Sequence, residues 1–348
     1  MWDSLLNKWG KMKVKSRKLK FIAIVISIIM LMCGCIEKES KIEPKTEIEK
    51  ERITLTPGSY RSIDGKNNVI YYLNDDYIYE KLDVEELVIE YNSKSGNYIF
   101  IKDDDVFVNY LGKNIKIDDE RVKSPKLSND GNYLFYFHNS GILEPKVVDL
   151  KNETELTIDN ATMISGQFID WISDNKLIYY GIRIEDKKSG IFIYDLINKK
   201  EEVVYEINKG YISFLKAIEK EVVFIEENME NKKVLLSLEN NNSFKEVTDK
   251  IIDIKDIIKI KEKVYILGKV KNDVYSIYEI SNNNLHRVVY DFPIMINLEK
   301  GLSVSDKDEL LFMGSNNDYN EQNIYSYSDG TVKLISQKEG NYDFINIK

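Results

Sequence analysis

A repeated pair of short apolar runs is the feature that most constrains how this 348-residue chain folds. Seven cores of four apolar or aromatic residues recur, and each is followed after a polar gap by a second apolar run. The cores are VIYY at 69–72, YIFI at 98–101, YLFY at 133–136, LIYY at 177–180, VVFI at 222–225, VYIL at 264–267 and LLFM at 310–313. Short runs rich in Ile, Val, Tyr and Phe, separated by Asn, Asp and Gly, are typical of β-strands and their turns. The chain is therefore predicted to be all-β from Ile53 onward.

The spacing of these runs predicts the kind of repeat. From the third core onward, successive cores begin 44, 45, 42 and 46 residues apart, and a third, more polar run closes most units. A repeat of about 40–45 residues with three or four strands is typical of a β-propeller blade. Seven four-stranded blades are predicted, and six is the alternative because the first two cores begin only 29 residues apart. The C-terminal GNYDFINIK, at 340–348, is predicted to complete the first blade and close the ring, which leaves fewer strand edges unpaired.

One segment, KIIDIKDIIKIKEKV at 250–264, shows two periodicities at once. Ile251, Ile254 and Ile258 are spaced as on a helix, whereas neighbouring isoleucines alternate as in a strand. We predict an inner strand with a preceding turn, and a helix is the alternative.

The segment SPKLSNDGNYLFYF, at 124–137, resembles the repeat of TolB-type β-propellers. The positions that match that repeat are Ser124, Pro125, Ser128, Asp130 and Gly131. Weaker copies at 170–180 and 302–314 lack the Asp-Gly pair. The resemblance implies a TolB-like propeller over residues 53–348. Asp-Gly favours a tight turn between the innermost strand and the next, and Ser and Asp side chains bond such a turn's own amides. We therefore assign Asp130 a structural role in preference to a ligand role.

The N-terminus differs in texture from the rest of the chain. Seven basic side chains and one acid lie in residues 1–20, and an apolar run, FIAIVISIIMLMC, follows at 21–33. As a helix this run rises about 20 Å at ~1.5 Å per residue, which is less than the ~30 Å hydrocarbon core of a membrane. A secretion signal is therefore predicted, with translation starting at Met1 or at Met12.

The end of this apolar run, Met32-Cys33-Gly34-Cys35, resembles the lipobox of bacterial lipoproteins. The resemblance implies cleavage between Gly34 and Cys35 and a diacylglyceryl anchor on Cys35; a non-lipidated signal or an uncleaved anchor is the alternative. It divides the chain into a signal peptide at 1–34, a lipidated N-terminus and charged tether at 35–52, and the propeller at 53–348. The implied location is the extracytoplasmic face of the cell membrane. The lipobox-like sequence, together with heavy use of Lys, Ile and Asn, suggests a Gram-positive-type bacterium.

The charge of the exported part limits its partners. Without residues 1–34 the chain has 42 basic and 57 acidic residues, a formal net charge of −15. So acidic a body is repelled by phosphate backbones and anionic lipid headgroups. Nucleic acid is therefore not an expected partner, and membrane contact is expected to come from the acyl chains. The protein is expected to be a monomer.

The sequence lacks the common catalytic motifs. It contains no Gly-x-Ser-x-Gly, His-Glu-x-x-His, P-loop or dinucleotide-binding motif. His138 and His286 are its only histidines, and we interpret both as surface or packed side chains. Asp103-Asp104-Asp105 lacks the spacing and Gly of a calcium loop and is predicted to be a solvated turn. No metal or cofactor is expected, and the chain is predicted not to be an enzyme.

Three functions are considered. The favoured one is a non-catalytic, lipid-anchored scaffold that holds a protein or peptide partner on a propeller face. An enzyme acting on cell-wall glycans is the second, and it requires two or more carboxylates ~5–9 Å apart at one channel mouth. A small-ligand sensor or substrate-binding lipoprotein is the third, and it requires a deep apolar pocket.

Overall fold

The computed structural model describes residues 53–348 except 65–66, 75–77, 219–220, 239–242, 282–283 and 318–320. The predicted signal peptide at 1–34, the lipidation site at Cys35 and the tether up to residue 52 lie outside the described residues. Within the described ranges, no helix is long and apolar enough to cross a membrane.

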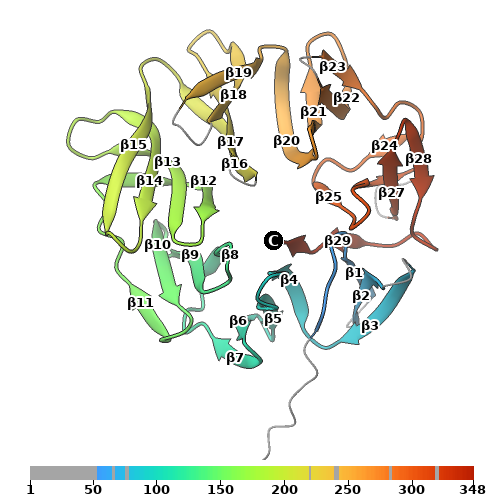
Figure 1. Ribbon diagram of the computed structural model, residues 1–348, viewed down its shortest axis with the longest axis horizontal. Helices are drawn as coiled ribbons and strands as arrows, with labels where there is room; N and C mark the ends of the chain where they lie inside the picture. The colour runs from blue at the N-terminus through green and yellow to red at the C-terminus, as the bar shows by residue number, and fades with distance from the viewer. Residues whose placement is uncertain are drawn as a thin grey trace, which may run out of the picture. The chain divides into compact units, whose positions relative to one another are not determined.

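Thirty strands in the described part of the chain form seven sheets, arranged as the blades of a ring (Figure 1). The predicted all-β propeller is thus confirmed, with seven blades instead of the alternative six. The first blade comprises β29 (Tyr342–Phe344), β1 (Tyr60–Asp64), β2 (Asn67–Leu73) and β3 (Tyr79–Val84). The second comprises β30 (Asn346–Ile347), β4 (Leu87–Tyr91), β5 (Tyr98–Lys102), β6 (Asp105–Tyr110) and β7 (Lys113–Lys116).

Blades three to five each hold four consecutive antiparallel strands. The third comprises β8 (Val122–Leu127), β9 (Tyr133–Asn139), β10 (Leu143–Asp149) and β11 (Thr154–Leu156). The fourth comprises β12 (Thr162–Ser173), β13 (Lys176–Arg183), β14 (Ser189–Asp195) and β15 (Lys200–Ile207). The fifth comprises β16 (Tyr211–Ile218), β17 (Glu221–Glu227), β18 (Lys233–Leu238) and β19 (Phe244–Thr248).

The last two blades follow the same plan. The sixth comprises β20 (Ile251–Ile260), β21 (Lys263–Val270), β22 (Tyr275–Ser281) and β23 (Asn284–Arg287). The seventh comprises β24 (Met295–Ile296), β25 (Leu302–Val304), β26 (Leu310–Ser315), β27 (Asn323–Ser328) and β28 (Thr331–Leu334), with β24 and β25 both pairing with β26. In blades three to six the first strand in the sequence lies nearest the centre of the ring (Figure 1).

The apolar cores of the sequence form the walls between blades. Among the described residues, seven hydrophobic clusters form, and each combines side chains of two adjacent blades. At the junction of the third and fourth blades, for example, Phe135 and Phe137 pack with Trp171 and Tyr179, all at most 2% exposed. A blade buried on both faces needs continuous apolar runs, which is why these strands do not alternate strictly.

Two C-terminal strands close the ring. β29 pairs antiparallel with β1, so Tyr342–Phe344 completes the first blade as predicted. The chain then steps sideways, and β30 pairs in parallel with β4 of the second blade. The C-terminus accordingly lies at the centre of the ring (Figure 1).

The segment with two periodicities is an inner strand, as predicted. β20 runs from Ile251 to Ile260 and pairs with β21. Its register shifts between Ile251 and Asp253 and again between Ile254 and Asp256. Each bulge inserts an extra residue and so resets which side the following side chains face. That explains why no single period fits this segment.

Candidate ligand site in the central channel

The TolB-like sequence forms the turn between β8 and β9. Tyr133 N–H donates to Ser128 Oγ at 3.0 Å, and Ser128 Oγ–H donates to Asp130 Oδ1 at 2.6 Å. Asp130 Oδ1 also accepts from Asn132 N–H at 3.0 Å. Gly131 has φ of +74°, and a Cβ there would lie 2.3 Å from Ser95 Oγ of the second blade, so only glycine fits. Asp130 is thus occupied within its own turn.

The first two residues of that sequence lie earlier in the same inner strand. Ser124 and Pro125 lie at the register shift of β8, between Lys123 and Lys126. Ser124 has φ of +50° there. The bulge places Lys126, the next residue, beside the fourth blade, where it becomes part of the site described below.

A cavity of about 1150 Å³ lies among the inner strands of blades three to six and the C-terminal segment. Its wall carries six lysines and three aspartates, mixed with apolar side chains such as Phe214 and Ile258. The charged residues are Lys94, Lys126, Asp170, Asp174, Lys176, Lys216, Lys255, Asp256 and Lys348. Five of these lysines are ion-paired with an aspartate or glutamate, namely Lys126, Lys176, Lys216, Lys255 and Lys348. The cavity wall therefore presents charges of both signs to a ligand.

One charged residue from each blade faces its neighbours around the channel, and we call this set the charged belt. In blade order it consists of Asp343, Glu90, Lys126, Asp170, Lys216, Asp256 and Lys300. From the second blade to the seventh, acid and base alternate. From Lys126 to Lys300, successive members lie 44, 46, 40 and 44 residues apart, which is close to one sequence repeat.

Each belt lysine contacts the acid of the following blade. Lys126 Nζ lies 3.3 Å from Asp170 Oδ1, and Lys216 Nζ lies 2.5 Å from Asp256 Oδ1. Lys300 contacts Asp343 in the same way across the closing junction. The first two lysines also donate to inner-strand carbonyls of the next blade, at Ile169 (2.8 Å) and Ile257 (2.9 Å).

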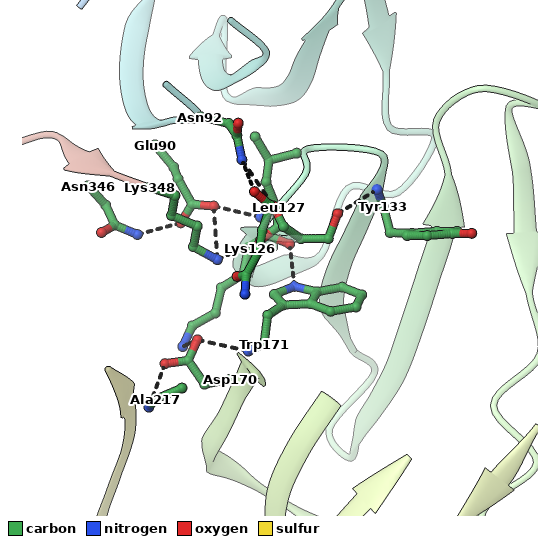
Figure 2. A network of polar contacts seen from close by, with 12 residues as sticks. Glu90, Asn92, Lys126, Leu127, Tyr133, Asp170, Trp171, Ala217, Asn346 and Lys348 are labelled. Carbon is green, nitrogen blue, oxygen red and sulfur yellow. Dashed lines mark hydrogen bonds and ion pairs between the residues drawn. The ribbon is translucent and has the colours of Figure 1, made fainter. Parts of the chain in front are cut away.

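Three belt acids in turn each accept a backbone N–H of the following blade. Leu127 N–H donates to Glu90 at 2.6 Å, Ala217 N–H to Asp170 at 3.2 Å and Leu302 N–H to Asp256 at 2.8 Å. Inner-strand edges thus have part of their hydrogen-bonding groups satisfied by side chains of the belt. Figure 2 shows this arrangement around Glu90 and Asp170.

Seven blades cannot alternate strictly, because seven is odd, and the two acids Asp343 and Glu90 therefore follow one another. Additional cations compensate at this junction. Arg61 lies 3.2 Å from Asp343 and also donates to Val88 O of the second blade at 2.5 Å. Lys348 reaches Glu90 from the C-terminal segment, with Nζ 3.6 Å from Oε1, and donates to Leu127 O (Figure 2).

Asp170 shows the electrostatic effect of the belt. Burial by itself raises the pKa of this carboxyl, but Lys126 and Lys348 favour the charged form, as do the amides of Ala217 and Trp171 that donate to it. The net result is a pKa below the ordinary value for aspartate. Asp170 therefore remains an anion and an acceptor at neutral pH, and it is not poised to act as a proton donor.

The belt residues are not among the site residues predicted from the sequence. A signal was present, since Lys126, Asp170, Lys216 and Asp256 recur near the repeat period within inner strands. The repeats were recognised by their apolar cores, which lie on the second strand of each blade. The inner strands that carry the belt residues were therefore not compared with one another.

The remaining candidates from the sequence lie away from the channel. His138 Nδ1 lies 2.8 Å from Asp119 Oδ2, beside a hollow of about 520 Å³ at the junction of the second and third blades. His286 is exposed on the outer strand β23. Asp103 and Asp104 form the turn between β5 and β6, with φ of +51° and +67°. Among the described residues, no group of three or more His, Cys, Asp or Glu side chains is placed to hold a metal ion.

No protein-family model matches this sequence, and no curated protein does either. Solved structures do match. The β-propeller domain of the Trilobed protease from Pyrococcus furiosus is 17% identical, with a TM-score of 0.51 over 72% of this chain and 85% of that one. The oligogalacturonate lyase from Vibrio parahaemolyticus is 14% identical, with a TM-score of 0.50 over 81% and 85%. TolB from Acinetobacter baumannii is 12% identical, with a TM-score of 0.43 over 82% and 81%. At these identities the likeness concerns the fold alone.

Longer peptidases match as well. This chain spans 43% of the length of a prolyl endopeptidase and 46% of that of an acylaminoacyl peptidase from Pyrococcus horikoshii. The propeller fold is thus shared with the Trilobed protease, a prolyl endopeptidase and a lyase.

One expectation is corrected by these comparisons. The prediction that the chain is not an enzyme is wrong as drawn, because the solved structures above that share its fold include two peptidases and a lyase. The prediction rested on missing sequence motifs. Such motifs belong to particular active sites, and a fold hosts many kinds of site, so their absence is no argument against catalysis.

Proposed function

We propose that this protein binds an extended protein segment or peptide in its central channel, at the extracytoplasmic face of the cell membrane. The observation that carries the proposal is that the channel already holds an extended segment of the chain itself. Lys348 N–H donates to Tyr91 O at 2.9 Å, and Ser93 N–H donates to Lys348 O at 2.8 Å. These are main-chain contacts of the kind by which a peptide adds to a sheet edge.

The size and lining of the cavity support a peptide ligand. A volume of about 1150 Å³ is ample for several residues beyond the segment already present. Nine charged side chains line it, so it is not the deep apolar pocket that a small-ligand sensor requires. Both signs of charge are available, which suits a ligand that carries amides, carboxylates and ammonium groups.

The proposed location rests on the N-terminal sequence. The lipobox-like Met32-Cys33-Gly34-Cys35 favours a diacylglyceryl anchor on Cys35, and the charged residues up to 52 favour a tether. Such an anchor would hold the propeller near membrane-bound or cell-wall partners and raise their effective concentration.

An acidic oligosaccharide is the second candidate ligand. The lysines of the cavity favour it, since ammonium groups pair with sugar carboxylates, although five of the six also pair with an aspartate or glutamate of the protein. Three carboxylates also line the same cavity, although Asp170 and Asp256 are both ion-paired with lysines. The lyase with this fold is named for an oligogalacturonate, which is a substrate of that protein.

The test is a crosslinked pull-down from intact cells with the tagged full-length chain. Three variants accompany it: Cys35→Ala removes the proposed anchor, Lys94→Glu changes a charge on the cavity wall, and Lys333→Glu makes the same change on the outer strand β28. We expect one extracytoplasmic protein to be enriched, with recovery lowered several-fold by Cys35→Ala and Lys94→Glu and unchanged by Lys333→Glu.

Two results would contradict the proposal. Recovery of no protein with any version would favour the oligosaccharide. Equal recovery with Lys94→Glu and Lys333→Glu would place the partner on another surface of the propeller.

A further inference from the structure

We propose that residues Asn346–Lys348 occupy a peptide-binding position of the channel, and that this position accepts an extended peptide with a lysine or arginine in place of Lys348. The inference rests on the proposed channel function. It specifies the chemistry of the peptide and the segment that the peptide replaces. It is carried by the contacts of the C-terminal segment.

The main-chain contacts of this segment do not depend on its sequence. β30 pairs in parallel with β4, with Asn346 opposite Glu90 and Ile347 opposite Tyr91. Ser93 continues the pairing, since both its N–H and its hydroxyl donate to Lys348 O. Any extended peptide can make such contacts, which provide affinity without selecting side chains.

The side-chain contacts select a cation. The Glu90 side chain is only 5% exposed and accepts from Asn346 Nδ2 at 2.6 Å, with Lys348 Nζ 3.6 Å away. Lys348 also donates to Leu127 O, and its charge is felt by Asp170 (Figure 2). A buried carboxylate left without its cation is strongly unfavourable. A neutral side chain in place of Lys348 therefore binds poorly, whereas an ammonium or guanidinium group restores the pair.

The charged belt explains why the cation comes from outside the blades. Two acids follow one another at the junction of the first and second blades, where an odd ring cannot alternate. Arg61, within the first blade, compensates Asp343. Glu90 is compensated by Lys348, which lies just beyond a strand of two residues. The site is therefore complete only when a separate segment supplies its positive charge.

The segment can be exchanged without opening the ring. β29 closes the first blade independently, and Ile345, which is 1% exposed, anchors the chain beyond it. Beyond Ile345, the residues Asn346, Ile347 and Lys348 all line the cavity, from which an incoming peptide has access. The tethered segment competes at an effective concentration in the millimolar range, so the unaltered protein binds such a peptide weakly.

The test uses two fluorescent peptides, FINIK and FINIQ. FINIK copies residues 344–348, and FINIQ differs only in having a neutral glutamine in place of Lys348. Their binding to the full-length chain, purified in detergent, is measured by fluorescence anisotropy. The Lys348→Gln protein weakens the internal competitor, and Lys333→Gln is the matched control. We expect FINIK to bind Lys348→Gln at least about tenfold more tightly than FINIQ does, and about tenfold more tightly than it binds the control. Adding Glu90→Gln should remove the preference for FINIK.

A second measurement does not depend on a variant. Without peptide, the Lys348 amide donates to Tyr91 O. In the unaltered protein, millimolar FINIK should displace this segment and speed hydrogen exchange at the Lys348 amide. The proposal is overturned if FINIK and FINIQ bind Lys348→Gln equally, or if FINIK leaves that exchange rate unchanged. These results concern purified protein, so they can fail while the pull-down succeeds, and the reverse also holds.

Discussion

Blades three to six and the closing region formed by blades seven, one and two build the same ring in different ways. In the repeating blades each sheet is a run of consecutive strands, and its inner-strand charge pairs with the next blade. In the closing region, two sheets each combine strands from both ends of the described chain, and two cations outside the belt, Arg61 and Lys348, compensate two successive acids. A ring with an odd number of blades thus needs an irregular junction, and here that junction borders the proposed binding position.

The hydrophobic cores of the two regions also differ, because the core at the closing junction is smaller. Among the described residues, the core at the junction of the third and fourth blades comprises ten buried residues. The core at the closing junction comprises four, which are Tyr60, Met313, Ile324 and Tyr342. Tyr60 stacks on Tyr71 at 4.9 Å and meets Tyr342 edge-on at 5.4 Å. Burial, with a smaller contribution from Tyr71, raises the pKa of Tyr342 to about 12. Because fewer groups hold this junction, each contributes more to closure.

The largest expected effect is at the closing core. Tyr342→Ala removes a side chain that is 2% exposed, and it should lower the free energy of unfolding by about 3–5 kcal/mol. Tyr342→Phe is the control, since it loses only the hydroxyl donated to Lys338 O and should cost about 1 kcal/mol. Urea unfolding measures both, and hydrogen exchange should show β1 opening first in Tyr342→Ala. Equal losses for the two variants would mean that packing does not govern closure.

A smaller effect is expected where the belt is irregular. Glu90→Gln leaves Lys348 without its carboxylate in a largely buried position and should cost about 3 kcal/mol. Lys216→Gln, in the repeating part, affects a pair whose lysine is 34% exposed and should cost about 1 kcal/mol or less. Urea unfolding compares them, and a double-mutant cycle of Glu90→Gln with Lys348→Gln measures the coupling. Equal losses in free energy of unfolding for Lys216→Gln and Glu90→Gln would mean that the belt pairs contribute equally in the repeating blades and in the closing region.

The smallest expected effect is a pH dependence in the repeating part. The folded-state pKa of Asp170 lies below its unfolded value, so its contribution to stability is present above about pH 4 and is lost as the pH falls through the lowered folded value. The difference in free energy of unfolding between the unaltered protein and Asp170→Asn should be largest at pH 7 and shrink toward pH 3. A difference that stays constant over this range would show that Lys126 and the amides do not favour the charged form.

The sequence by itself determined the architecture, because the relevant signals are local. The apolar runs and turn residues indicate the strands of each blade. Their period of about 44 residues indicates that the same packing between neighbouring blades recurs with every repeat. The same reasoning identified β20 as an inner strand and the C-terminal segment as the closing element. It did not separate Tyr342–Phe344 from Asn346–Ile347, since the sideways step between two blades leaves no pattern in the sequence.

Only the tertiary structure decided which charges meet. Lys126 and Asp170 lie far apart in the chain, and their contact depends on bulges, blade order and the angle between neighbouring inner strands. Glu90 and Lys348 come from opposite ends of the propeller and meet only because the ring closes and its last residues enter the channel. Electrostatic pairing depends on distance in space. The recurrence of charges near the repeat period can therefore mark candidate positions in the sequence, but only the folded ring decides which of them pair.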